Sequence, residues 1–173
     1  IIVNLLFLSH LDSQKPDLIF EAVNLNECVM EAFDSVYKLA ETKHQNIELT
    51  ALPYSNISGD QDLLIRLFYN LLENAIKYNQ NKHKEIVLNY KESLTHWVFT
   101  VSDNGIGIDS DYHQKIFELF KRLHTTVEYE GTGIGLSICK RIVTNHKGVI
   151  NVFSALNQGT SIEFTIAKRL KNK

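Results

Sequence analysis

The sequence predicts an α+β fold, a two-layer α/β sandwich in which a mixed, mostly antiparallel sheet carries about three helices on one face. Strand-like segments come in sequential pairs within 84–103 and 149–167. Three further segments, 24–42, 60–76 and 133–146, have apolar residues at helical spacing. With 173 residues, 44% of them hydrophobic, the chain is long enough to bury one sizeable core.

The first elements follow from local signals. The apolar opening at 1–8 lacks a basic leader and a small-residue cleavage site, so we interpret it as the end of a helix cut from a longer protein, although a helix native to this domain has the same periodicity. Pro16 predicts a boundary, which assigns 1–16 to that helix and 17–173 to the domain that follows. A strand is expected at 18–23, and Asn24 with Glu27 three residues later predicts the start of a helix reaching residue 42.

The middle of the chain is predicted as a strand at 47–52, a loop at 53–59, and a strongly periodic helix with Asp60 as its N-cap. A hairpin of strands at 84–92 and 96–103 should turn at Ser93. The remaining expected elements are a helix at 109–120, a polar stretch at 121–132, a helix at 133–146, and paired strands at 149–154 and 160–167.

Composition limits the partners and the compartment. Eighteen Lys and Arg against twenty Asp and Glu leave a net charge of −2, which does not favour nucleic acid or an anionic membrane. Cys28 and Cys139 are far apart and belong to no CxxC or His/Cys cluster, so neither a disulfide framework nor a zinc site is predicted. A reducing, cytoplasmic compartment is the simplest inference, and the apolar runs are shorter than the roughly 18 residues of a membrane span.

Three motifs point to a bound nucleotide. One stripe of the predicted helix carries Asn70, Asn74 and Lys77. The two amide oxygens are suitable ligands for Mg²⁺, and the lysine ammonium is suitable for phosphate. A polar helix face exposed to solvent would have the same pattern. Asp103 follows a strand and could accept a hydrogen bond from the exocyclic amine of adenine, while guanine would present a second acceptor; a solvent-facing turn is the alternative. The glycine-rich segment 131–136 opens a helix whose first N–H groups favour an anion, although a loop and cap alone would look the same.

Taken together, these motifs resemble those of sensor histidine kinases, within the histidine kinase-like (GHKL) ATPase superfamily. The segment 70–78 is similar to the family's asparagine box, and 103–107 to its first glycine box. The segment 117–120 is similar to its phenylalanine box, and 131–136 to its second glycine box. The resemblance covers about 17–168 and implies the Bergerat-type ATP-binding fold, with ATP and Mg²⁺ as cofactors.

The resemblance also implies roles for individual residues in binding metal and phosphate. Asn74 resembles the principal Mg²⁺ ligand and Asn70 its partner. Lys77 and Arg122 resemble phosphate contacts, so the implied catalytic set is Asn70, Lys77 and Arg122. An amide at position 70 stands where gyrase-type ATPases use a glutamate to activate water, and an amide cannot take a proton at neutral pH. The site should therefore orient MgATP for transfer to another nucleophile rather than hydrolyse it.

Further residues are implied around the adenine and the lid. Asp103 resembles the adenine-reading carboxylate, Tyr78 a ring against the base, and Thr160 a support for adenine through Asp103 or a water. Phe117 and Phe120 resemble anchors of a lid at 121–132, with core packing as the alternative. Gly105 and Gly107 resemble residues that shape this pocket, and the lid is similarly hinged by Gly131, Gly133 and Gly135. Leu136, in the second glycine box, is implied as a nucleotide-binding residue.

The implied activity is that of a histidine protein kinase in two-component signalling, but none of the seven histidines has the sequence context of the family's phosphoacceptor. We therefore expect the acceptor histidine to lie on an upstream helical hairpin that is absent from this chain. The parent protein is expected to be a homodimer, with a response regulator receiver domain as a partner. The domain itself is expected in the cytoplasm, and membrane anchoring of the parent stays open. The fragment alone should not phosphorylate itself. Two alternatives remain open: a serine kinase of the anti-sigma type, and a module that binds a nucleotide or a partner without catalysis.

Overall fold

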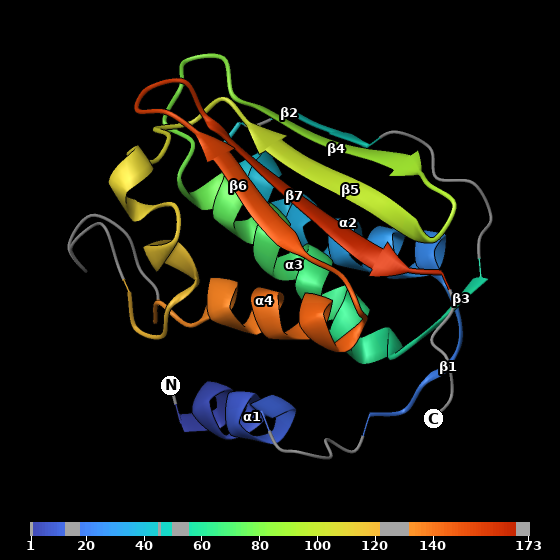
Figure 1. The fold of residues 1–173 in the computed structure, drawn as a ribbon. Coiled ribbons are helices and arrows are strands. Elements are labelled where there is room, and N and C mark those ends of the chain that lie inside the picture. The colour runs from blue at the N-terminus through green and yellow to red at the C-terminus, as the bar shows by residue number, and fades with distance from the viewer. Residues whose placement is uncertain (1, 13–17, 45, 50–55, 122–131, 169–173) are drawn as a thin grey trace.

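The computed structural model describes residues 2–12, 18–44, 46–49, 56–121 and 132–168. Five strands form the main sheet in the order β2-β4-β5-β7-β6 (Figure 1). Their bounds are β2 Asn46–Leu49, β4 Glu85–Glu92, β5 His96–Asp103, β6 Ile150–Ser154 and β7 Thr160–Ala167. Only the β2–β4 pair is parallel among these strands. The mixed, mostly antiparallel sheet predicted from the sequence is therefore confirmed.

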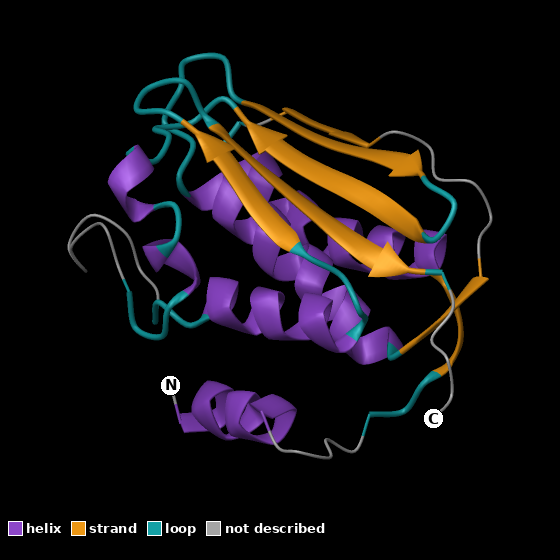
Figure 2. Cartoon of the chain, viewed as in Figure 1, coloured by secondary structure: helices purple, strands orange, loops and turns teal. Residues whose placement is uncertain are grey.

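Helices cover one face of this sheet, as Figure 2 shows. The layer consists of α2 (Leu25–Thr42), α3 (Gln61–Lys77) and α4 (Gly135–Asn145), with α3 packed against both of the others. A further helix, α1 (Ile2–Asp12), lies against α4 on the side away from the sheet (Figure 1). The predicted two-layer arrangement with three helices on one face is confirmed, and α1 adds a partial third layer. No helix in the described ranges is long and apolar enough to span a membrane.

The core lies between α3 and the centre of the sheet. Phe68 of α3 meets two sheet rings edge-on, with ring centroids 5.1 Å from Phe99 and 5.5 Å from Phe164. Phe99 and Phe164 face each other on β5 and β7, stacked at 5.3 Å. All three rings are fully buried, and such close-packed aromatic contacts fix α3 relative to β5.

The two predicted helix starts are confirmed. The Asn24 side chain accepts a hydrogen bond from the N–H of Asn26 at 3.1 Å and donates to Glu27 at 2.9 Å. Asp60 caps α3 by accepting from the N–H of Leu63 at 3.2 Å. Each cap satisfies a backbone donor that a helix leaves unpaired at its first turn.

Two local predictions were wrong. Part of the predicted 53–59 loop is a strand, β3 (Asn56–Gly59), which pairs antiparallel with β1 (Glu21–Asn24) in a separate two-stranded sheet. Four residues are too few to show a strand periodicity, and the partner is distant in the chain. The predicted helix at 109–120 is instead two short 3₁₀ helices, η1 (Ser110–Tyr112) and η2 (Lys115–Phe117). Only Ile116 and Phe117 are buried there, which suits a short turn rather than a continuous helical face.

Candidate functional site

A cavity of about 480 Å³ opens between the C-terminal part of α3, the ends of β5 and β7, and the start of α4. It brings together all three motifs singled out in the sequence. Predicted site residues in its wall are Asn70, Asn74, Lys77, Tyr78, Asp103, Gly107, Gly133, Gly135, Leu136 and Thr160. Gly105 is buried and donates its N–H to Asp103 of this wall, while Arg122 and Gly131 fall outside the described residues.

The α3 wall presents amides and a cation to the cavity. The Nδ2 of Asn70 is buried and has no hydrogen-bond partner in the described part of the chain. The Nζ of Lys77 lies 4.8 Å from the centroid of the Tyr78 ring, at the point where the helix ends. Leaving a buried amide nitrogen unpaired costs free energy, so the fold holds the Asn70 side chain in the cavity wall at a local cost.

Opposite α3, Asp103 lies at the carboxyl end of β5. Its Oδ1 accepts a hydrogen bond from the N–H of Gly105 at 2.8 Å. Burial raises the pKa of Asp103 from 3.8 to about 6, and hydrogen bonds from the backbone of Gly105 and Thr160 oppose that shift. Thr160 is also the direct cross-strand partner of Asp103. A desolvated carboxylate of this kind gains from any donor that a ligand brings to it.

Glycine is required at two turns that frame the carboxylate. Gly107 has φ of +69°, and a Cβ there would lie 1.9 Å from the carbonyl oxygen of Ala155. Gly159 has φ of +82°, and its Cβ would lie 2.0 Å from the carbonyl oxygen of Asp103. Because neither glycine leaves room for a side chain, the turn after β5 packs directly against the β6–β7 turn. The backbone atoms of these two turns form the floor of the pocket.

The third wall is the N-terminus of α4. Gly133 has φ of +71°, which turns the chain into the helix. The N-cap residue Ile134 offers no side-chain hydrogen bond to the first turn, and Gly135 and Leu136 line the cavity. The first N–H groups of a helix without a side-chain cap favour an anion, so this end of the cavity suits a phosphate group.

The side chains in this cavity suit a divalent cation that is coordinated partly by a bound ligand, rather than one enclosed by carboxylates. Within the described ranges no group of three or more His, Cys, Asp or Glu residues could hold a metal ion. Amide oxygens of Asn70 and Asn74 and the oxygens of a bound phosphate chain are the hard ligands that Mg²⁺ takes, with water completing its coordination. These residues therefore fit Mg²⁺ that enters together with a nucleotide.

The two phenylalanines that resemble lid anchors differ in their environment. Phe117 is buried in the core cluster, whereas Phe120 is 54% exposed and has φ of +59°. The αL conformation is unusual for an aromatic residue and occurs here three residues after the end of η2.

Sequence reasoning missed several residues of the site. Arg66 and Asn4 line the cavity beside Asn70, and the position of Arg66 four residues before Asn70 on the same helix was the available signal. Asn79 and Asn104 support the floor, because Nδ2 of Asn79 donates to Oδ1 of Asn104 at 2.8 Å. That pairing joins the end of α3 to the turn after Asp103, and nothing local in the sequence indicates it.

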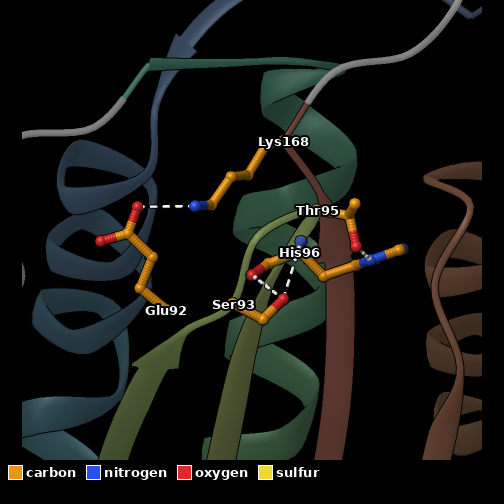
Figure 3. Close-up of polar contacts among 5 residues, drawn as sticks. All are labelled: Glu92, Ser93, Thr95, His96 and Lys168. Carbon is orange, nitrogen blue, oxygen red and sulfur yellow. Dashed lines mark hydrogen bonds and ion pairs between the residues drawn. The ribbon is translucent and has the colours of Figure 1, made fainter.

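A second polar cluster, at the β4–β5 hairpin, is structural (Figure 3). Ser93 Oγ donates to the carbonyl of His96 at 2.9 Å and accepts from its N–H at 3.0 Å, which closes the turn. One ring nitrogen of His96 contacts Thr95 Oγ1 at 2.8 Å, and the other contacts the carbonyl of Lys147 at 3.0 Å. Lys168 pairs with Glu92 at 2.6 Å. Each group is satisfied within the protein, and the cluster lies on an exposed turn.

Comparison with known proteins identifies the family. Residues 59–170 match the model of the histidine kinase-, DNA gyrase B- and HSP90-like ATPase family. The phytochrome-like protein Cph1 of Synechocystis sp. is 36% identical over 96% of this chain and 22% of its own length. The chain thus spans about a fifth of the length of such curated relatives.

Solved structures agree with this match. The catalytic domain of histidine kinase ThkA superposes with a TM-score of 0.76 at 26% identity, over 88% of this chain and 97% of that one. Full-length ShkA in complex with AMPPNP superposes with a TM-score of 0.83 at 23% identity, over 95% of this chain and 34% of that one, which shows the shared fold. The chain therefore belongs to the histidine kinase-, DNA gyrase B- and HSP90-like ATPase family, as the ATP-binding catalytic domain of a sensor histidine kinase.

Proposed function

We propose that this domain binds MgATP in the cavity between α3 and α4 and transfers the γ-phosphoryl group to a histidine on a helical hairpin upstream of this chain. The observation that carries the proposal is the joint placement, in one cavity, of the Asn70–Asn74–Lys77 stripe, the desolvated Asp103 carboxylate and the uncapped start of α4. Each of these three features suits a different part of a magnesium-bound adenine nucleotide.

The adenine end is assigned to Asp103. Its carboxylate accepts from the exocyclic amine of adenine, with Tyr78 against the base and Thr160 beside the carboxylate; Gly105 and Gly107 let the backbone approach. Guanine would place a carbonyl oxygen against the same carboxylate, which leaves two acceptors facing each other. The expected discrimination is on the order of 1–3 kcal/mol.

The triphosphate end is assigned to α3 and α4. Asn70 and Asn74 would hold Mg²⁺, which neutralises charge on the phosphates when bound. Lys77, the first N–H groups of α4 near Gly133 and Gly135, and Arg122 from outside the described residues would orient the phosphates. The same proposal includes Gly131 as a hinge of the lid and Leu136 as a nucleotide-binding residue.

The transfer needs no base at position 70. A neutral imidazole nitrogen of the acceptor attacks with its own lone pair and forms a P–N bond to the γ-phosphorus, while the bond to the β–γ bridging oxygen breaks and its electrons leave on ADP. The proton of the other ring nitrogen passes to solvent or to a base on the acceptor hairpin. Because the amide of Asn70 cannot accept a proton from water, hydrolysis is disfavoured and positioning dominates catalysis.

The partners and compartment follow from this assignment. The acceptor hairpin of the parent chain and a response regulator receiver domain are the protein partners, and the parent protein would be a homodimer. Residues 1–16 would be the end of that hairpin and 17–173 the catalytic domain. Buried free Cys28 and Cys139, with pKa values raised to about 12 by burial, are compatible with a reducing, cytoplasmic compartment.

Calorimetric titration and phosphoryl transfer test the proposal. ATP and ADP should bind more tightly with Mg²⁺, and GTP should bind about 5- to 150-fold more weakly than ATP, the factor that corresponds to 1–3 kcal/mol. Asn74→Ala should abolish the effect of Mg²⁺, whereas Asn151→Ala, which removes an exposed amide on β6, should not. With labelled ATP the fragment alone should stay unlabelled, and added parent hairpin should acquire an acid-labile phosphohistidine. Equal affinity for ATP and GTP, or strong self-labelling, would contradict the proposal.

A further inference from the structure

Arg66 extends the polar stripe of α3 by one turn. It lies four residues before Asn70 and eight before Asn74, and all three line the same cavity. Residues at this spacing share one helix face. The stripe that carries the proposed metal and phosphate contacts therefore begins with a guanidinium group.

The guanidinium is held by α1 rather than by a carboxylate. Its Nη2 donates to Oδ1 of Asn4 at 2.7 Å, and its Cζ lies 3.8 Å from the centroid of the Phe7 ring. Across the described ranges Arg66 forms no ion pair. Partial burial lowers the pKa of Arg66, and an arginine side chain stays protonated at neutral pH. A partly buried cation whose contacts are a neutral amide and a ring still lacks an anion.

The α1 residues that hold Arg66 belong to the interface that attaches α1 to the domain. Asn4, Leu8 and Leu11 lie at helical spacing on one side of α1, and the two leucines are buried where α1 packs beside α4. The opposite side of α1 exposes Ile2, Val3 and Leu6. Release of Arg66 from Asn4 and Phe7 would therefore remove part of the interface that holds α1 against the domain.

We propose that Arg66 is a phosphate-binding residue shared between two partners: α1 in the absence of a triphosphate, and the terminal phosphate when MgATP occupies the cavity. Each bidentate fork of the guanidinium uses one of the two Nη2 hydrogens, and Asn4 accepts from one of these hydrogens. We expect the phosphate to draw the guanidinium away from Asn4 and into the cavity, so that triphosphate binding and α1 docking oppose each other. Thermodynamic linkage makes the effect reciprocal, so weakening the α1 contact should tighten ATP binding. This inference rests on the proposed MgATP site and adds a residue that distinguishes ATP from ADP.

The ratio of ATP to ADP affinity, measured by calorimetry with Mg²⁺ on the full 173-residue chain, tests the inference. Arg66→Gln should weaken ATP binding roughly tenfold and change ADP binding less than about twofold, because only ATP carries the terminal phosphate. Lys91→Gln, which removes an exposed positive charge on β4, is the matched control and should change neither. Asn4→Ala leaves Arg66 in place and should tighten ATP but not ADP.

Amide hydrogen exchange over 2–12 gives a readout that does not depend on affinity. MgATP should speed exchange in α1 relative to MgADP in the wild-type chain but not in Arg66→Gln. Equal losses of ATP and ADP affinity in Arg66→Gln, or no change in either, would overturn the proposal, as would an ATP affinity that Asn4→Ala leaves unchanged or weakens. If Arg66→Gln does not fold, the Asn4→Ala result decides alone. A wild-type chain that binds no MgATP would instead refute the proposed function.

Discussion

At the scale of single residues, Asp103 is the group whose ionisation most directly links the site to stability. The folded state raises its pKa from 3.8 to about 6, so the folded chain holds this proton more tightly than the unfolded chain does. The stabilising effect of the protonated carboxyl is present below pH 4 and is lost as pH rises through about 6. At pH 7 the buried carboxylate therefore destabilises the domain without ligand, on the order of 2–3 kcal/mol.

We expect Asp103→Asn to separate stability from binding. Without nucleotide, the variant should be more stable than the wild type at pH 7, by up to about 2 kcal/mol, and the difference should shrink toward pH 4. ATP affinity should fall at pH 7 and lose its preference over GTP. Urea unfolding at both pH values and calorimetry with both nucleotides measure these effects. A variant that is less stable than the wild type at pH 7 would show that the carboxylate is not strained by burial.

The fold buries the side-chain amide nitrogen of Asn70 at a cost in folding free energy. Its Nδ2 is buried and unpaired among the described groups, beside the fully buried Cys139 of α4. The nearby Asn70 side chain lowers the pKa of the Cys139 thiol, while burial raises that pKa overall to about 12.

At the scale of elements, the glycine turns differ in what they require, although the sequence presents them alike. A Cβ at Gly107 would overlap the Ala155 carbonyl, whereas a Cβ at Gly135 would meet nothing within 4 Å. Gly107 also has positive φ, while Gly135 is the first residue of α4. The turn at Gly107 is therefore closed by a backbone contact, and the turn at Gly135 is open to the cavity.

This difference predicts opposite effects of the same substitution. Gly107→Ala should destabilise the domain by about 2–4 kcal/mol and weaken nucleotide binding, because both the αL backbone and the Ala155 contact must change. Gly135→Ala should be neutral or stabilising by up to about 1 kcal/mol, since alanine favours a helix and has room there. Thermal unfolding of the two variants makes the comparison, and equal destabilisation would contradict it.

The elements found from the sequence were those with strong local signals. α3 was predicted from its apolar periodicity and from Asp60, and β5 and β7 were predicted as members of two sequential strand pairs. β3 and the two 3₁₀ helices were missed or misassigned because their form depends on what they pack against. A four-residue strand exists only through its partner β1.

At the scale of the whole molecule, His146 joins segments that are far apart in the chain. It is fully buried; Nδ1 lies 2.9 Å from the carbonyl oxygen of Ile142, and Nε2 accepts from the N–H of Asp60 at 3.1 Å. Since the carbonyl can only accept, we assign the proton to Nδ1. The Phe20 ring meets it edge-on at 5.4 Å, so the segment before β1, the start of α3 and the end of α4 meet at one imidazole.

Acid should therefore weaken the whole fold through this residue. Burial lowers the pKa of His146 below 6.5, which the nearby Asp60 only partly opposes, so the folded state favours the neutral ring. Its contribution is fully present above pH 6.5 and is lost as pH falls below that value toward the folded pKa. In His146→Gln, which retains an acceptor that does not titrate, we expect lower stability at pH 7.5 but a smaller loss toward pH 5.5. Urea unfolding should show the gap between wild type and variant narrowing with acid, and a constant gap would contradict the assignment.

The sequence alone determined the sheet-and-helix class of this protein, most of its helices and strands, and the residue types that a magnesium nucleotide would need. These depend on periodicity, caps and short motifs, which act over a few residues. Only the tertiary structure decided that Asp103 is desolvated, that Gly107 is closed by Ala155 while Gly135 is open, and that Arg66 is held by α1. Burial, steric contact and hydrogen bonding between distant segments are set by neighbours brought from elsewhere in the chain, so no local pattern could have specified them.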